Sequence, residues 1–292
     1  MTNDDMAKIV DTNDAWIRRK TGIEKRYFAE KMENSDMAMA AARQAIKTSG
    51  LPAESIDLIV VCTFTHDLET PSMACRIAGR IGAPENVLTF DINGACSGFI
   101  HGMTTVNALL ESGRCKRALI VGSEKLSQMV DYGNRNTCVL FGDGAGALVV
   151  EYEEDGLFIS NAGCHPDDDI LGCRKDGEGI FMSGQEVYRF AVSRIPMSMQ
   201  ETLDSAGMTA DDVDWFVCHQ ANMRIIESVA RKMGVPMERF FTNIQYTGNT
   251  AAASVAICLG EMMERGLFKK DMTFLASGFG AGLTWGSILM KV

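Results

Sequence analysis

Apolar runs and amphipathic stretches alternate along almost the whole chain. Short runs rich in β-branched and aromatic residues predict strands, and longer stretches with apolar residues every three to four positions predict helices. In the first half the predicted strands are 56–64, 87–92, 117–123 and 145–151, and the predicted helices are 35–48, 72–81 and 96–112. In the second half the predicted helices are 186–206, 222–233 and 250–265, and the predicted strands are 215–218, 272–277 and 283–290. Strands that alternate with helices indicate a layered α/β architecture.

The pattern starts again after residue 156, and short sequences repeat between the two halves. L-L-E-S-G from Leu109 leads into C-K-R-A-L-I-V-G-S, and M-M-E-R-G from Met262 leads into F-K-K-D-M-T-F-L-A-S, at an offset of 153. F-G-D-G-A-G-A-L-V-V from Phe141 is similar to G-F-G-A-G-L-T-W-G from Gly278. This similarity predicts a duplication, with halves 1–155 and 156–292 packed about a pseudo-two-fold axis. Chance matching of glycine-rich turns is the alternative.

Composition and charge narrow the class of protein. The 46% hydrophobic content over 292 residues supplies a large core. The apolar runs are far shorter than the ~20 residues that span a bilayer, and the acidic start M-T-N-D-D-M is no signal peptide, so we expect a soluble cytoplasmic protein without membrane contact. The net charge of −10 argues against nucleic-acid binding. Nine cysteines without paired C-x-x-C spacing indicate reduced thiols.

One cysteine lies where a predicted strand turns into a predicted helix. Cys96 is the centre of D-I-N-G-A-C-S-G-F-I, residues 91–100. The free N–H groups and positive dipole end of a helix N-terminus favour a thiolate. Gly94 and Gly98 leave room for a sharp turn. The alternative interpretation is a small buried residue that fills a tight turn.

A histidine and an asparagine are the candidate partners of this thiol. The offset of 153 relates Cys96 to Asn249 and His66 to His219, which predicts that Cys96 and Asn249 occupy equivalent helix starts. His219 ends a predicted strand, and α/β sites lie at that edge of a sheet. A histidine that only donates structural hydrogen bonds is the alternative interpretation.

The segment C-H-P-D-D-D-I-L-G-C contains possible metal ligands. Cys164, His165 and Cys173 belong to it, together with three aspartates. Their spacing matches no compact zinc pattern, so we expect an acidic surface loop and no metal site.

Cysteine, histidine and asparagine together indicate acyl transfer through a thioester. Thiolate attack on an acyl thioester divides one difficult step into two. Histidine and asparagine side chains are suited to donate hydrogen bonds to the enolate that forms when a carboxylate leaves as CO2. The small residues of the loop at 278–282 permit a backbone N–H to approach the first oxyanion closely.

Six short motifs along the chain are D-T-N-D-A-W-I with T-G-I, G-A-C-S-G-F, L-F-G-D-G-A-G-A, H-Q-A-N-M-R-I-I, G-N-T-A-A-A-S and G-F-G-A-G-L-T-W-G. With these motifs the chain resembles β-ketoacyl-[acyl carrier protein] synthase III, the initiating condensing enzyme of dissociated fatty acid synthesis, in the thiolase-like superfamily. The motifs cover almost the whole chain in the family's order. The resemblance implies an α/β thiolase-like fold with two duplicated halves in five αβαβα layers.

The resemblance also implies roles for individual residues. Cys96 would be the acylated nucleophile, His219 and Asn249 the decarboxylation pair, and the backbone N–H groups of Cys96 and Ala281 the oxyanion hole. The residues expected to bind coenzyme A are Trp16, Lys20, Arg135, Asn222 and Arg224. Those expected to line the acyl pocket are Thr70, Leu126, Leu140, Phe141, Met182, Tyr188 and Phe279.

The implied reaction uses two substrates and no cofactor. A short acyl-coenzyme A primer, acetyl-coenzyme A above all, would acylate the thiol, and malonyl-acyl carrier protein would then decarboxylate and condense with it. The acidic carrier protein would dock on a basic patch, and the family resemblance also implies a homodimer. This patch comprises Arg189, Arg224, Arg231 and Lys232. A solvated helix face is the alternative interpretation of these charges.

Two other functions stay open from the sequence. One is a related condensing enzyme or acyltransferase of secondary metabolism. The other is a non-catalytic protein that only binds a carrier protein or a catalytic homologue.

Three positions depart from the family pattern. Members of the family begin with a strand that belongs to the first sheet, and no counterpart precedes Thr2, so we expect unpaired backbone groups, an uncovered apolar face and reduced stability. Thr70 stands where many members have a phenylalanine that closes the acyl pocket, which favours longer or different primers. Lys20 stands where an arginine is common, so it keeps the charge but lacks bidentate geometry.

Overall fold

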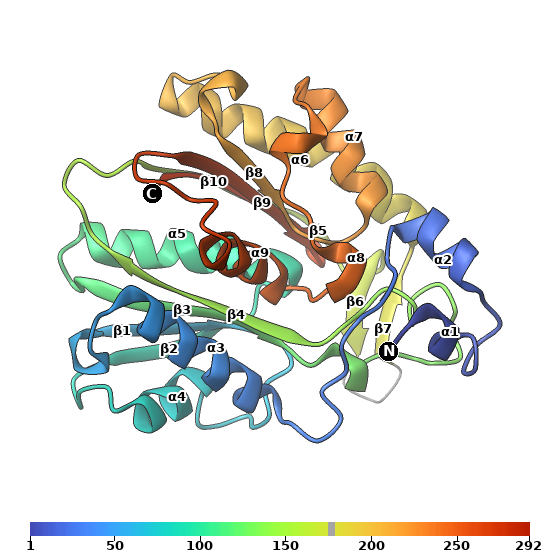
Figure 1. Ribbon diagram of the computed structural model, residues 1–292, viewed down its shortest axis with the longest axis horizontal. Coiled ribbons are helices and arrows are strands. Elements are labelled where there is room, and N and C mark those ends of the chain that lie inside the picture. Colours follow the sequence, from blue (N-terminus) through green and yellow to red (C-terminus); the bar gives the residue numbers. More distant parts are fainter. Residues whose placement is uncertain (175–178) are drawn as a thin grey trace.

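The computed structural model describes residues 1–174 and 179–292 (Figure 1). The first sheet has the strand order β2-β1-β3-β4. Its strands are β1 (Leu58–Cys62), β2 (Leu88–Ile92), β3 (Arg117–Glu124) and β4 (Gly144–Glu151). β1 is parallel to both of its neighbours, whereas β4 is antiparallel to β3. Because β4 is the last strand in this order, it is an edge strand in the part of the chain that the structure describes.

The second sheet has the strand order β5-β10-β9-β8. Its strands are β5 (Phe158–Asp167), β8 (Trp215–Cys218), β9 (Thr273–Gly280) and β10 (Gly282–Lys291). β8 and β9 are parallel, and β10 is antiparallel to both β9 and β5. A separate hairpin joins β6 (Leu171–Arg174) to β7 (Gly179–Met182).

Helices cover both faces of each sheet and form three layers (Figure 1). The helices are α1 (Asn3–Met6), α2 (Asp14–Thr21), α3 (Asn34–Ser49), α4 (Met73–Ile81), α5 (Gly98–Glu111), α6 (Gly184–Ala206), α7 (Met223–Met233), α8 (Ile244–Thr247) and α9 (Ala253–Glu264). α3 and α4 pack on the outer face of the first sheet, and α6 and α7 pack on the outer face of the second. α5 and α9 lie between the sheets. The order of layers is therefore αβαβα, which confirms the predicted fold class.

The central layer is packed closely because glycines of the strands lie against helix backbone. A Cβ atom on Gly146 would lie 2.4 Å from the backbone nitrogen of Ile257 in α9. A Cβ atom on Gly122 would lie 2.7 Å from the carbonyl oxygen of Ala252. The core cluster around α5 and α9 includes Val60 from the first sheet and Ala276 from the second, so one helix layer binds the two sheets together.

Every predicted strand and helix is present, but the short helices α1 and α8 and the strands β5, β6 and β7 were not predicted. At the start of α3, Asp67 accepts hydrogen bonds from the backbone nitrogens of Asn34 and Ser35. The expectation of a loop over residues 164–173 is wrong at both ends, because Cys164 and His165 lie in β5 and Cys173 lies in β6. Only residues 168–170 connect the two strands. The pattern of β5 was missed because exposed and half-buried residues alternate there with little apolar signal.

The offset between equivalent residues of the two halves is not the same for all elements of the structure. β3 and β9 have eight residues each and begin 156 positions apart. Ala95 and Ala251, also 156 apart, both have a positive φ, of 45° and 44°, just before α5 and α9. Gly113 and Gly266, which follow these helices, are 153 apart. The turns that precede α5 and α9 are therefore related by an offset of 156 residues. With this offset Cys96 corresponds to Ala252, and the predicted equivalence of Cys96 with Asn249 is wrong.

Candidate active site

A cavity of about 610 Å³ brings Cys96, His219 and Asn249 together. Cys96 follows β2, His219 follows β8, and Asn249 lies between α8 and α9. Parallel strands place the residues at their carboxyl ends on one edge of a sheet, and the two sheets bring two such edges together. Three side chains that are far apart in sequence thus share one hollow.

The turn that carries Cys96 is held by contacts to the second sheet. A 3-10 turn, Ala95–Ser97, precedes α5, so the helix begins at Gly98 and not at the cysteine. The residue with positive φ is Ala95, and neither neighbouring glycine has one. A Cβ atom on Gly280 of β9 would lie 2.7 Å from the Cys96 nitrogen. This close approach fixes the position of the nucleophile relative to the β9–β10 connection.

Burial dominates the acidity of the Cys96 thiol. Desolvation and then the nearby Glu124 carboxyl raise the pKa of Cys96 to about 12, and a hydrogen bond from its own backbone acts in the opposite direction. The expectation that the helix start would favour a thiolate is therefore wrong for the free site. The Cys96 side chain is a neutral thiol at neutral pH.

Glu124 is a buried carboxyl beside this site that the sequence reasoning missed. It has no exposed surface, and it accepts hydrogen bonds from the hydroxyls of Thr63 and Thr65 and from the backbone nitrogen of Phe64. Burial raises the pKa of Glu124 to about 8, against the effect of these hydrogen bonds. An acidic residue that ends a buried strand, as in V-G-S-E, is the signal that would have found it.

The His219 ring is buried and is hydrogen-bonded to a serine. Nδ1 lies 2.6 Å from the Oγ of Ser254, which also accepts a hydrogen bond from the Gln220 nitrogen. The tautomer in which the hydroxyl donates to Nδ1 has the ring proton on Nε2. Burial lowers the pKa of His219 to about 3, so the imidazole is neutral. Phe279 packs edge-on against the ring, with centroids 5.4 Å apart.

Asn249 is fixed by its backbone and by its side-chain oxygen. Its nitrogen donates to Leu140, and its carbonyl oxygen accepts from Gly142, both at 2.9 Å. Its Oδ1 accepts from the Ala251 nitrogen at 2.9 Å. The Nδ2 group is therefore the part of the side chain that remains to donate a hydrogen bond in the cavity.

Four of the five residues expected to bind coenzyme A line the cavity. Trp16, Lys20, Asn222 and Arg224 line it. The Arg135 guanidinium lies 4.4 Å above the Trp16 ring. The Asn222 side chain donates to the Lys20 carbonyl oxygen at 3.1 Å and accepts from the Arg224 nitrogen, so it links α2 to the start of α7. An aromatic face with flanking cations is suited to a nucleotide.

The residues expected to line the acyl pocket divide into two groups. Leu140, Phe141, Met182, Tyr188 and Phe279 line the cavity. Thr70 and Leu126 do not. Thr70 is exposed, and Leu126 is completely buried behind the wall in a cluster with Leu140.

Sequence reasoning missed part of the cavity wall. The further lining residues are Thr21, Asn136, Val139, Leu171, Gly184, Gln185, Val187, Ala221 and Ile225. Several come from β6 and the start of α6, next to the hairpin that was not predicted. The signal that would have found Ile225 is its helical spacing of three residues from Asn222.

The four basic residues of the expected patch are exposed on two neighbouring helices. Arg189 lies on α6, and Arg224, Arg231 and Lys232 lie on α7. The Tyr188 hydroxyl donates to Ser228 at 3.5 Å, so the two helices are in contact. Within residues 1–174 and 179–292, no carboxylate forms an ion pair with any of the four.

No group of three His, Cys, Asp or Glu side chains among the described residues is arranged to hold a metal ion. No described helix is long and apolar enough to cross a membrane.

Comparison with known proteins gives one family. Residues 90–167 match the profile "3-Oxoacyl-[acyl-carrier-protein (ACP)] synthase III", and residues 203–292 match its C-terminal profile. The chain is 41% identical to "Beta-ketoacyl-[acyl-carrier-protein] synthase III" of Clostridium acetobutylicum and 43% identical to that of Geobacillus kaustophilus, each over 100% of this chain and 94% of the relative. The crystal structure of the Aquifex aeolicus synthase III superposes with a TM-score of 0.97 at 39% identity, covering 100% of this chain and 95% of that one.

Proposed function

Since this chain belongs to the β-ketoacyl-[acyl carrier protein] synthase III family and is therefore an initiating condensing acyltransferase of fatty acid synthesis, we propose that Cys96, His219 and Asn249 carry its two half-reactions. The observation that supports this most is that all three side chains line one cavity. The substrates are an acyl-coenzyme A and a malonyl-acyl carrier protein.

In the first half-reaction the Cys96 sulfur attacks the carbonyl carbon of the primer thioester. The new Sγ–C bond replaces the bond to the coenzyme A sulfur, and the thiol proton ends on the released coenzyme A. The backbone N–H groups of Cys96 and Ala281 hold the oxyanion of the tetrahedral intermediate. Ala281 directly follows Gly280, which touches the Cys96 backbone, so both donors belong to one rigid contact.

In the second half-reaction the malonyl group loses CO2 and leaves an enolate on its thioester carbonyl. Nε2–H of His219 and Nδ2–H of Asn249 donate to this oxygen. A neutral imidazole suits the role because it already holds its proton at the nitrogen that donates. The enolate carbon then attacks the acyl carbonyl on Cys96, the C–S bond breaks, and the thiolate regains a proton. The products are 3-oxoacyl-carrier protein and CO2.

Different residues bind the coenzyme A and the acyl chain of the primer. Trp16 with Arg135 holds the adenine, and Lys20, Asn222 and Arg224 follow the rest of the coenzyme A. The apolar end receives a short acyl chain, with acetyl as the primer. Because Thr70 is exposed and does not line the cavity of the single chain, it does not limit chain length there.

The carrier protein docks on the patch formed by Arg189, Arg224, Arg231 and Lys232. Acidic carrier surfaces complement such a stripe on an enzyme that is acidic as a whole. The enzyme acts as a cytoplasmic homodimer and needs no cofactor.

Intact mass spectrometry tests the nucleophile and the primer together. The protein is incubated with a panel of acyl-coenzyme A thioesters, and we expect a single acyl adduct that maps to Cys96. Acetyl-coenzyme A is expected to label fastest. The proposal is wrong if Cys96→Ser retains condensation, or if no thioester of the panel labels the protein.

A further inference from the structure

Two hydroxyl groups join the turn that carries Cys96 to the turn between β9 and β10. Oγ of Ser97 lies 2.6 Å from Oγ1 of Thr284, at the short end of the range for an O–H···O hydrogen bond. Ser97 directly follows Cys96 and is completely buried. Thr284 is the third residue of β10 and lies opposite Gly280 of β9. The two residues are 187 positions apart, so only the folded chain brings them together.

Each hydroxyl also closes the turn to which it belongs. Oγ of Ser97 lies 2.8 Å from the carbonyl oxygen of Gly94, across the turn that contains Cys96. Oγ1 of Thr284 lies 3.1 Å from the carbonyl oxygen of Ala281, across the turn that begins at Ala281. The backbone N–H groups of Cys96 and Ala281 are the two proposed oxyanion donors. Each hydroxyl therefore belongs to the turn that carries one donor, and the contact between the hydroxyls links the donors.

The hydroxyl pair has two protons for three contacts, because each hydroxyl donates one hydrogen bond. Two oxygens 2.6 Å apart repel each other unless a proton lies between them, so one proton is shared within the pair. If Thr284 donates to Ser97, then Ser97 donates to Gly94. If Ser97 donates to Thr284, then Thr284 donates to Ala281. The bond between the two turns is present in both arrangements.

Backbone packing and this bond limit the position of the Cys96 turn in opposite directions. A Cβ atom on Gly280 would lie 2.7 Å from the Cys96 nitrogen, and one on Gly278 would lie 3.3 Å from the Cα atom of Ser97. The turn therefore rests directly on β9 and cannot move closer to it. Van der Waals contact does not prevent the turn from moving away, whereas a hydrogen bond of defined length does.

We propose that the hydroxyl pair Ser97–Thr284 is a positioning element that holds the N–H groups of Cys96 and Ala281 at the separation that one oxyanion requires. This inference rests on the proposed function of the site. Both donors must reach the same oxygen, each at about 2.7–3.1 Å, and this fit matters most when the charge develops. Neither hydroxyl lines the cavity, so the pair acts through the two donors and not through contact with the primer.

Four variants test the pair: Ser97→Ala, Thr284→Val, the double variant and Thr284→Ser. Rapid-quench intact mass spectrometry measures single-turnover acylation of Cys96 as a function of thioester concentration. The probe is the acyl-coenzyme A that labels the natural chain fastest. We expect each of the first two variants to lower the maximal rate by at least about tenfold, because a misplaced donor weakens the transition state. The half-saturating concentration is expected to stay near its natural value, because coenzyme A is bound by other residues.

The other two variants show whether the hydroxyls act together. The double variant is expected to acylate as fast as the slower single variant, because the second substitution removes a bond that is already lost. Thr284→Ser keeps the hydroxyl and is expected to acylate near the natural rate. In each single variant the remaining hydroxyl keeps a carbonyl acceptor in its own turn. We therefore expect midpoints of chemical denaturation close to that of the natural chain.

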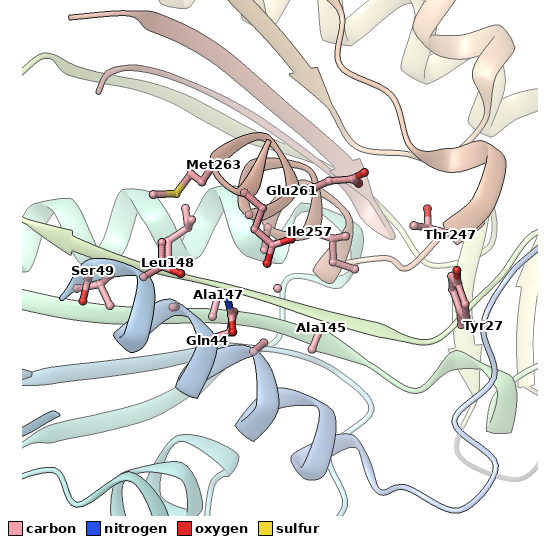
Figure 2. A pocket seen from close by; sticks show the side chains of 18 of the residues that line it. Tyr27, Gln44, Ser49, Ala145, Ala147, Leu148, Thr247, Ile257, Glu261 and Met263 are labelled. Carbon is pink, nitrogen blue, oxygen red and sulfur yellow. The ribbon is translucent and has the colours of Figure 1, made fainter. Parts of the chain in front are cut away.

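Two serine variants are matched controls. Ser49 Oγ donates to the carbonyl oxygen of Ile46 at 2.8 Å, as Ser97 does to that of Gly94. Ser49 lines the surface pocket shown in Figure 2, which shares no lining residue with the active-site cavity. Ser287 of β10 forms a buried hydroxyl pair with Ser198 at 2.9 Å, also outside the cavity lining. Ser49→Ala and Ser287→Ala are expected to acylate at the natural rate.

The proposal is overturned if Ser97→Ala and Thr284→Val acylate at the natural rate, or if their losses multiply in the double variant. It is also overturned if Thr284→Ser is as slow as Thr284→Val, or if the half-saturating concentration rises while the maximal rate is unchanged. These failures differ from a failure of the proposed function. In that case no thioester of the panel acylates Cys96 of the natural chain, and the inference fails with it.

Discussion

Nδ1 of His219 lies 2.6 Å from Oγ of Ser254, and both atoms are buried. The serine also accepts the Gln220 N–H. We expect its own proton to be donated to Nδ1, which leaves the ring proton on Nε2, the nitrogen proposed to donate to the enolate. Ser254 is then a positioning residue for the proposed role of His219.

Ser254→Ala removes that orientation. The buried Nδ1 loses its partner, at a cost of about 1–3 kcal/mol, so we expect condensation to fall by about tenfold to a hundredfold. Acylation of Cys96 by acyl-coenzyme A is expected to stay near its normal rate, because His219 acts on the malonyl step. Single-turnover acylation and steady-state condensation measure the two. An equal loss in both would contradict a role confined to His219.

Asn249→Asp tests the second donor to the enolate. The aspartate keeps an oxygen for the Ala251 nitrogen but replaces the donating amide by an acceptor. We expect decarboxylation of malonyl-carrier protein to fall by about 10²–10³, as for the loss of one oxyanion donor. Release of labelled CO2 measures it. A normal rate of CO2 release would exclude Asn249 from this step.

Gly280→Ala tests the contact that fixes the nucleophile. Its Cβ would lie 2.7 Å from the Cys96 nitrogen, so the turn must move. We expect a loss of about 1–3 kcal/mol in the free energy of unfolding and a large loss of Cys96 acylation. Chemical denaturation and intact mass spectrometry measure the two effects. Gly79→Ala, where the new Cβ meets nothing within 4 Å, is expected to change neither.

Glu124 makes stability depend on pH. Its pKa is raised from 4.5 to about 8, so between these values the folded chain binds a proton that the unfolded chain lacks, and the free energy of unfolding falls as pH rises through this range. The pKa of His219 is lowered from 6.5 to about 3 and has the opposite effect, but only below about pH 6.5. Between pH 6.5 and 8, therefore, Glu124 acts without the opposing effect of His219.

In that window we expect denaturation experiments to show falling stability for the natural chain and a flatter profile for Glu124→Gln, which cannot ionise. Identical slopes for the two proteins would show that Glu124 does not titrate there.

The sequence by itself determined the elements and the chemical identity of the site. Apolar runs such as Leu58–Cys62 and the helical spacing of 223–233 depend on neighbours in the chain, so local pattern was enough to predict them. The motif around Cys96 and the H-Q-A-N and G-N-T motifs predicted a nucleophile and its two partners, and all three side chains line one cavity. β5 was not predicted because exposed and half-buried side chains alternate along it without a strong apolar run.

Only the tertiary structure decided the protonation states of the Cys96 thiol and the His219 imidazole. The pKa of a thiol or an imidazole depends on how much water packing removes, and the packing around Cys96 and His219 comes from both sheets. The buried Glu124, the serine behind His219 and the exposure of Thr70 likewise depend on segments far apart in sequence.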